Sequence, residues 1–363
     1  MKAPFVWFGG KRRVAPEVWA ALGDVPNYIE PFAGSLAVLL GRPHDMSNGT
    51  RRAETVNDAD GFLANFWRAL AHDPEAVAHW CDWPVNEVDL FARHLWLVNT
   101  GRSRLLEGME ADPDFYDAQV AGWWVWGVNA WIGSGWCSGD GPWVDTGDGI
   151  GKRPHLGNAG QGVNRKRPHL GNAGQGVNRQ LPHLGDAGQG VNRQRPHLGS
   201  PGAGGHNNME YRSNVLGYFE ELAGRLRDVR VCCGDWSRVC TSGAMSHGSR
   251  VGVFLDPPYL GDVRTADLYA VDDHTISHAV RDWCLEHGDD PRLRIVLAGY
   301  RAEHDDLMPD TWRRHYYSAS AAYSTTESAA RQDGNHANRA NEVLWFSPHC
   351  VTPDRQGELW EAL

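Results

Sequence analysis

The clearest chemistry in the sequence lies in FLDPPY (254–259), where a hydrophobic run ends in an aspartate, two prolines and a tyrosine. Such a strand would place Asp256 at its carboxyl end, where open α/β sheets bind ligands, and the prolines would stiffen the next turn. The protons of an amine conjugated to a ring can be accepted by a carboxylate and a backbone carbonyl, which would aim the lone pair of the amine nitrogen at a methyl donor. Tyr259 can stack on the ring that carries this amine. The alternative interpretation is a strand-ending turn with a capping aspartate.

A second candidate site lies in YIEPFAGS (28–35). Gly34 allows the backbone to turn tightly beneath a ligand, and Glu30 is placed near a cationic or hydroxyl-bearing group. Asp58 ends the next strand, at the position from which a carboxylate binds ribose hydroxyls. A single glycine turn is a weak signal by itself. No G-x-x-x-x-G-K-[ST] phosphate loop is present, which argues against nucleotide hydrolysis.

These residues require an α/β sheet to position them. Apolar periodicity predicts helices and strands in alternation before Gly61, and again after Met209, where VRVCCGDW, RVGVFLDPPY, LRIVLAGY and NEVLWFSP are typical of strands. We therefore predict one sheet domain in two halves. The predicted divisions are a cofactor-binding half (1–61), an insertion (62–208) and a catalytic half (209–363).

The insertion has three predicted parts: a helical part (62–121), a tryptophan-rich part (122–143) and basic repeats (152–200). GWWVWGVNAWIGSGWC (122–137) holds five of the 17 tryptophans. Its rings could stack on bases or sugars, or could form part of a core. The polar loop 325–342 could reach into a groove of DNA or remain solvated.

KRPHLGNAGQGVNR (152–165) is repeated exactly over 166–179 and approximately over 180–193, before a fourth copy breaks off. Residues 152–200 hold eight basic residues against Asp186 alone, a net charge of +7, whereas the rest of the chain carries −17. This asymmetry favours an extended element lying along DNA. The alternative is a drifting tandem duplication tolerated in a surface loop. The histidine in each copy lacks partners at ligand spacing, which argues against a metal site.

The bulk composition is that of an ordinary folded protein. The chain has 363 residues, of which 41% are hydrophobic, and no apolar run is long enough to span a bilayer. The N-terminus has too short an apolar stretch for a signal peptide, so we expect a cytoplasmic protein. The seven cysteines include no C-x-x-C pair and are expected to be reduced core residues.

Four segments in this order, FVWFGGKRR (5–13), YIEPFAGS (28–35), VNDADGFLANFWRAL (56–70) and FLDPPY (254–259), resemble the Dam-like DNA N6-adenine methyltransferases, in their phage and actinobacterial style. The resemblance covers the sheet domain, about 200 residues, and excludes the repeats. It implies a Rossmann-like methyltransferase sheet that uses S-adenosylmethionine, with a DNA-recognition insertion. Leu36 departs from the small residue of many relatives, which we expect to affect loop packing more than chemistry.

The resemblance implies roles for individual residues. Lys11 would lie near the carboxylate of the methyl donor, residues 30–35 beneath its methionine moiety, and Asp58 at its ribose. GDW (234–236) would contact its adenine, although Asp235 and Trp236 could also be a turn and a core aromatic. The predicted cofactor-binding residues are Trp7, Gly10, Lys11, Glu30, Phe32, Ala33, Gly34, Ser35, Asp58, Asp235, Trp236 and Asp256. The predicted catalytic residues are Asp256, Pro257, Pro258 and Tyr259. The predicted DNA-binding residues are Lys152, Arg153, Arg165, Lys166, Arg167, Arg179, Arg193, Arg195, Asn338 and Arg339.

The sequence therefore predicts an adenine-N6 methyltransferase that flips its target out of duplex DNA without a metal or a covalent enzyme intermediate. Cytosine-N4 or RNA-adenine methylation is the nearest alternative, because the tetrapeptide recognises the amine more than the ring. A non-catalytic DNA-binding protein is a second, and a protein-glutamine methyltransferase is disfavoured because Asp256 stands where such enzymes carry Asn. The sequence leaves open whether a restriction endonuclease accompanies the chain, and whether it acts as a monomer or homodimer.

Overall fold

A seven-stranded sheet forms the centre of the molecule. The computed structural model describes residues 1–5, 7, 11–43, 52–131, 136–137, 143–145, 150–152, 208–258, 276–317 and 342–352. The strand order is β5-β2-β1-β6-β7-β9-β8. The strands are β1 (Asn27–Glu30), β2 (Ala53–Asp58), β5 (Val229–Cys233), β6 (Val251–Leu255), β7 (Leu293–Tyr300), β8 (Arg313–Tyr317) and β9 (Glu342–Phe346).

The sheet joins strands from both sides of the insertion, as the sequence predicts. β1 pairs in parallel with β2 on one side and with β6 on the other, so strands more than 200 residues apart are direct neighbours. β9 is antiparallel to both β7 and β8. The sequence analysis did not predict β8, whose residues RRHYY lack a run of buried apolar side chains.

Successive side chains of the strands supply two separate cores. On β6, Phe254 belongs to one apolar cluster while Val253 and Leu255 belong to the other. Every residue of β6 is buried, which fits a parallel strand covered on both faces. The strand is therefore held rigidly up to the residue at which Asp256 follows.

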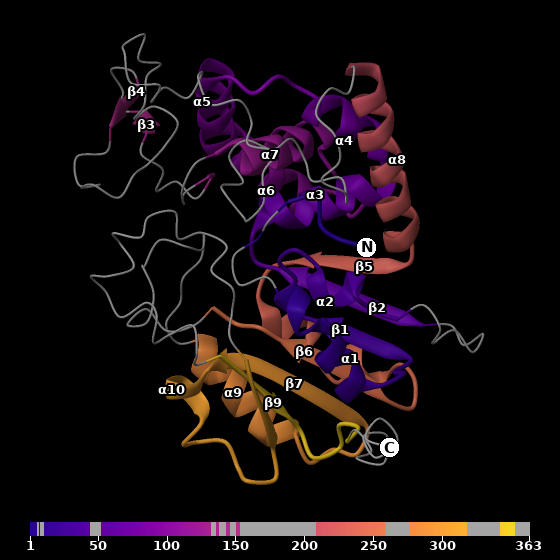
Figure 1. Cartoon of the computed structure of the whole chain (residues 1–363). Helices are drawn as coiled ribbons and strands as arrows, with labels where there is room; N and C mark the ends of the chain where they lie inside the picture. The colour runs from indigo at the N-terminus through magenta and orange to yellow at the C-terminus, as the bar shows by residue number, and fades with distance from the viewer. Residues whose placement is uncertain are drawn as a thin grey trace, which may run out of the picture.

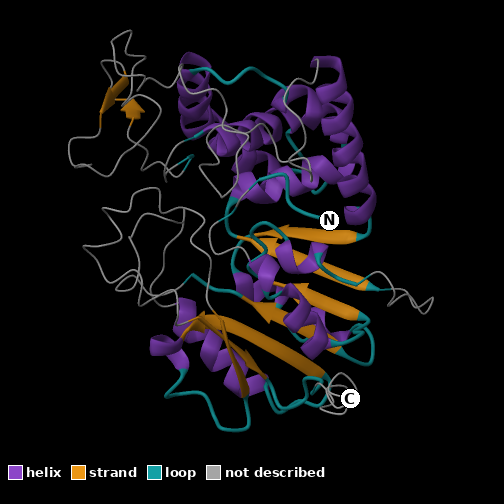
Figure 2. Cartoon of the chain, viewed as in Figure 1, coloured by secondary structure: helices purple, strands orange, loops and turns teal. Residues whose placement is uncertain are grey.

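Helices cover the sheet and form a body beside its β5 edge (Figures 1 and 2). The α-helices are α1 (Ala15–Leu22), α2 (Ala37–Leu40), α3 (Gly61–His72), α4 (Pro74–Cys81), α5 (Glu87–Trp96), α6 (Arg102–Ala111), α7 (Ala118–Ala130), α8 (Asn208–Leu226), α9 (Ile276–His287) and α10 (Arg301–His304). The described helical elements also include three 3₁₀ turns and a π-helical turn. The 3₁₀ turns are η1 (Lys11–Arg13), η6 (Trp236–Val239) and η7 (Ala244–Ser246), and the π-helical turn is η3 (Leu97–Gly101). No described helix combines the length and apolarity that crossing a membrane would need.

The helical body packs around aromatic side chains. Phe66 of α3 contacts Trp124 of α7 and Phe219 of α8, at ring-centroid distances of 5.7 and 6.4 Å. α8 thus packs on α3 and α4, although it follows the repeats in sequence. Trp124, Trp126 and Trp131 are buried, so most of the described tryptophans of 122–137 serve the core rather than an open surface.

A short antiparallel hairpin follows the tryptophan-rich part. It consists of β3 (Trp143–Asp145) and β4 (Ile150–Lys152), and β3 lies beside α5. The remaining repeat residues, 153–200, lie outside the described residues, as do 318–341, which contain most of the polar loop.

Candidate active site

The carboxyl ends of the parallel strands bring the predicted residues together at one edge of the sheet. Glu30 ends β1, Asp58 ends β2, and Asp256 directly follows β6. From β1 the chain proceeds to β2 on one side, while β6 pairs on the other, so the strand order reverses at β1. In open α/β sheets such a reversal opens a crevice in which ligands bind.

Asp256 is held by a lysine from the other end of the chain. The Lys11 ammonium lies 3.0 Å from Asp256 Oδ1 and 3.9 Å from Glu342 Oε2. Lys11 begins η1, just before α1, and is only 5% exposed. A buried lysine needs such carboxylate partners to keep its charge. The role of Lys11 near the cofactor's carboxylate stays a prediction, and in the structure its ammonium pairs with the carboxylate of the tetrapeptide.

Glu30 is a buried carboxyl beside this ion pair. Burial raises its pKa to about 8, and the negative charge of Asp256 acts in the same direction. The Tyr28 hydroxyl donates a hydrogen bond of 3.0 Å to Glu30 Oε2, and the backbone of Leu39 donates another. Glu30 therefore carries its proton at neutral pH, so the cluster holds less negative charge than three ionised carboxylates would.

The loop after β1 is shaped by a glycine and by Asp58. Gly34 has φ +47°, and a Cβ there would lie 2.9 Å from Cδ1 of Trp7. The Gly34 amide donates to Asp58 Oδ2 at 2.9 Å, and the Trp67 indole donates to the Gly34 carbonyl at 3.0 Å. A side chain at position 34 would thus strain the backbone and displace Trp7.

Leu36 is the second left-handed residue of this loop. It has φ 53°, and its side chain is fully buried. A left-handed backbone costs a non-glycine residue roughly 1–2 kcal/mol. Burial of a leucine side chain contributes about 1.5–3 kcal/mol, enough to offset that cost. The departure from a small residue at this position therefore affects loop packing, as the sequence predicts.

Two predicted cofactor contacts from distant segments meet as a stacked pair. The rings of Phe32 and Trp236 lie 6.2 Å apart with an interplanar angle of 26°. Both are half-buried, and Trp236 also meets Trp283 edge-on. Asp235 caps η6 by accepting from the Ser237 amide at 2.9 Å. Asp235 thus forms the turn that one interpretation of GDW expected. The contact of GDW with the cofactor's adenine stays a prediction.

The remaining predicted residues differ in burial, and several of them lie outside the described residues. Ala33 and Ser35 are buried in the loop, Pro257 is buried and Pro258 is half-buried. Lys152 ends β4. The predicted residues that lie outside the described residues are Gly10, Arg153, Arg165, Lys166, Arg167, Arg179, Arg193, Arg195, Tyr259, Asn338 and Arg339.

The sequence analysis missed two residues of this edge. Glu342 begins β9 and reaches the Lys11 ammonium. Trp67 of α3 fixes the Gly34 carbonyl. An acidic residue at the start of an apolar strand could have indicated Glu342, whereas the helical periodicity around Trp67 indicates only burial.

The first part of this arrangement matches a known family. Residues 7–85 match the family model of the D12 class N6 adenine-specific DNA methyltransferases. The match covers residues 7–85 of the 363 and identifies that part of the chain as D12-class. The matched span contains Lys11, the Gly34 loop and β2, and Asp256 lies beyond it. No curated protein matches the chain.

Members of the D12 class transfer a methyl group from S-adenosylmethionine to adenine N6 in DNA, and this is the reaction of the chain. The residues at the sheet edge fit that cofactor. Gly34 leaves space that a Cβ would fill, the rings of Phe32 and Trp236 offer flat surfaces beside it, and Asp58 ends the adjacent strand.

The raised pKa of Asp58 predicts how the affinity for the cofactor depends on pH. Burial raises its pKa from 3.8 to about 6. Ribose hydroxyls would donate to the ionised form, which predominates only above pH 6, so affinity is lost as pH falls through that value. We expect S-adenosylmethionine to bind about tenfold more weakly at pH 5 than at pH 7 in calorimetric titrations. Glu30, whose pKa is about 8, remains protonated across this window.

Asp58→Asn is the control for this effect, because it removes the titrating group at nearly unchanged size. The variant should bind the cofactor weakly at both pH values. A pH dependence equal to that of the unchanged chain would contradict the assignment to Asp58.

Proposed function

We propose that the chain methylates an adenine that is flipped out of duplex DNA, with Asp256 orienting the N6 amine. The observation that carries this proposal is the Lys11–Asp256 ion pair at the reversal of strand order, beside the Gly34 loop. A carboxylate fixed at this point can accept a hydrogen bond from the amine only when the base leaves the duplex. The target must therefore enter the crevice from outside the strand ends.

Asp256 would act by geometry rather than by covalent chemistry. Its carboxylate accepts one N6 proton and the Pro257 carbonyl accepts the other, which turns the nitrogen lone pair toward the donor. S-adenosylmethionine supplies an electrophilic methyl group on a sulfonium. Transfer would form the bond between N6 and the methyl carbon as the carbon–sulfur bond of the donor breaks, and the Asp256 carboxylate would take up one N6 proton and pass it to water. Lys11 keeps the Asp256 carboxylate in position during these steps.

The loop and the aromatic pair would hold the cofactor. Glu30 to Ser35 would lie beneath the methionine moiety, Asp58 would accept from the ribose, and Phe32 and Trp236 would contact the adenine. The Phe32–Trp236 pair supports the role at the adenine, because it offers flat rings. The two backbone amides that donate hydrogen bonds to Asp58 support its role at the ribose, because they fix its carboxylate at the end of β2.

Duplex contact is proposed for the basic segment 152–200. Its net charge of +7 on a chain of −10 overall supports contact with phosphates. The β3–β4 hairpin, whose last residue is Lys152, precedes this segment, and β3 lies beside α5 within the insertion. The repeats would hold the duplex while the sheet edge receives the base.

The test is identification of the methylated nucleoside. The purified chain is incubated with S-adenosylmethionine carrying a deuterated methyl group and with unmethylated plasmid DNA, and the digested nucleosides are analysed by mass spectrometry. We expect label in N6-methyldeoxyadenosine. Label only in N4-methyldeoxycytidine, or only in a parallel RNA sample, would overturn the proposal.

A chain that lacks residues 152–193 tests the role of the repeats in the same assay. We expect the labelled product to be retained at low salt and reduced at least about tenfold at physiological salt, because phosphate contacts are lost. Equal yields at both salt concentrations would assign DNA contact elsewhere.

A further inference from the structure

The Lys11 ammonium is shared by two carboxylates that come from different strands. Asp256 directly follows β6, and its Oδ1 lies 3.0 Å from Lys11 Nζ. Glu342 begins β9, and its Oε2 lies 3.9 Å from the same nitrogen. Because β7 lies between β6 and β9 in the sheet, the ammonium joins Asp256 to a strand on the far side of β7.

The two carboxylates differ in how far a substrate could reach them. The Asp256 side chain is 20% exposed, whereas that of Glu342 is 8% exposed. In the strand register Glu342 lies between Tyr300 of β7 and Tyr317 of β8. Glu342 thus meets the ammonium from a buried position, and its effect on a base in the crevice would pass through Lys11.

Two contacts can fix the position of a lysine where one cannot. The ammonium is a compact charge on a flexible four-carbon stem. A contact with Asp256 alone would set the distance between the two groups and leave them free to move together. Glu342 belongs to a strand that is paired on both sides, so its contact ties the ammonium to a rigid part of the sheet.

We propose that Glu342 is a positioning residue for methyl transfer. It anchors the Lys11 ammonium, which in turn holds the Asp256 carboxylate where the N6 amine must meet it. This inference rests on the proposed function, in which Asp256 orients the amine. If Glu342 served only to neutralise a buried charge, it would affect the stability of the chain but not the rate of its folded molecules.

The first test is Glu342→Gln in the full chain, which removes the charge at nearly unchanged size. Lys11 keeps Asp256 as a partner, so the fold tolerates the change. We expect the single-turnover rate at saturating methyl donor and DNA to fall about 10- to 100-fold, because a small loss of position has effects of this size. The affinities for S-adenosylmethionine and DNA should stay within about threefold, because the lost interaction concerns the transfer step.

Glu342→Asp is a second variant, which keeps the charge but withdraws the carboxylate from the ammonium by one methylene. We expect a rate about three- to tenfold below that of the unchanged chain, since the anchor is displaced rather than removed. Thermal melting and the folded fraction are measured for both variants. Unchanged rates per folded molecule in both would overturn the positioning role.

A double-mutant cycle tests the route through Lys11. Lys11→Met removes the ammonium at similar length and should slow transfer. Adding Glu342→Gln to Lys11→Met should then change the rate less than about twofold, because the contact that the second substitution breaks is already lost. Additive losses would show that Glu342 acts other than through Lys11 and would also overturn the proposal.

The matched control is Glu286→Gln, which changes an exposed glutamate of α9 in the same way and should transfer at the unchanged rate. Transfer is counted as label on any nucleoside. Label on a nucleoside other than N6-methyldeoxyadenosine, with Glu342→Gln still slow, would overturn the proposed function alone. N6-methyldeoxyadenosine formed by Glu342→Gln at the full rate would overturn the role of Glu342 alone, and absence of transfer by the unchanged chain would overturn both.

Discussion

Asp256→Asn is expected to transfer methyl groups about 10²- to 10⁴-fold more slowly than the unchanged chain, while still binding DNA and S-adenosylmethionine. The substitution keeps the size of the side chain but removes the charge that accepts the N6 proton. It also removes the partner that lies 3.0 Å from the Lys11 ammonium. Single-turnover methylation with a labelled methyl donor measures the rate, and separate titrations measure the two affinities.

The matched control is Asp306→Asn, which changes an exposed aspartate after α10 in the same way. It should methylate at the unchanged rate. Thermal melting of both variants distinguishes loss of chemistry from loss of fold. An Asp256→Asn rate within tenfold of the unchanged chain would remove Asp256 from the mechanism.

Glu54→Leu is expected to lower the free energy of unfolding by about 3–5 kcal/mol. Glu54 Oε1 lies 2.8 Å from Arg42 Nη1, and Glu54 Oε2 lies 2.6 Å from Arg225 Nη1. The Arg42 side chain is only 3% exposed, so without Glu54 its charge would stay buried without its close carboxylate partner. Urea denaturation followed by circular dichroism measures the change.

The comparison variant is Arg292→Gln, which breaks the exposed ion pair with Asp290. The Arg292 side chain is 64% exposed, and such pairs contribute at most about 1 kcal/mol. Burial tends to raise the pKa of Glu54, but Arg225 and Arg42 together lower it below the ordinary 4.5. The stabilisation by this pair is therefore present above pH 4.5 and is lost as pH falls further. A Glu54→Leu effect no larger than that of Arg292→Gln would contradict the buried network.

Much of the candidate active site could be predicted from the sequence, because its residues lie at or just after the carboxyl ends of strands. VGVFL is continuously apolar, which predicts a buried strand, and Asp256 is the first polar residue after it. Asp58 ends β2 in the same way, and Gly34 follows β1 at the turn. Parallel strands align their carboxyl ends, so three local patterns were sufficient to place these residues at one edge.

The partners of these residues could not be predicted in this way. Lys11 and Asp256 are 245 positions apart in the chain, and Glu342 approaches the same ammonium from β9. Arg225 reaches Glu54 from the last turn of α8, across the whole insertion. No local pattern carries such pairings, because they depend on how η1, α8 and β9 pack against the sheet.

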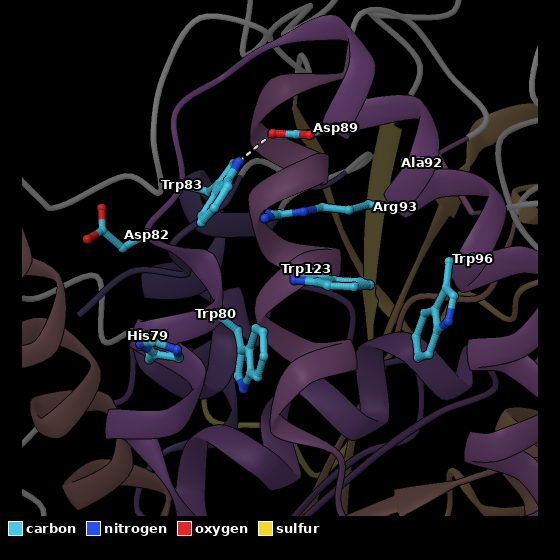
Figure 3. A pocket seen from close by; sticks show the side chains of 9 residues that line it. All are labelled: His79, Trp80, Asp82, Trp83, Asp89, Ala92, Arg93, Trp96 and Trp123. Carbon is cyan, nitrogen blue, oxygen red and sulfur yellow. Dashed lines mark hydrogen bonds between the residues drawn. The ribbon is translucent and has the colours of Figure 1, made fainter.

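The tryptophan-rich stretch illustrates the same division. Its composition determined that aromatic rings would gather. Trp124 and Trp126, two positions apart, point to different sides of α7, and both are buried because α7 packs against α3, α4 and α5. Trp123 instead faces a pocket whose other walls, Arg93 among them, come from α4 and α5 (Figure 3). By itself the sequence determined the strands, their terminal carboxylates and the reaction class, because backbone preference and apolar period act between near neighbours. Only the tertiary structure decided which charges pair and where Arg93 is enclosed, because those contacts join segments brought together by packing.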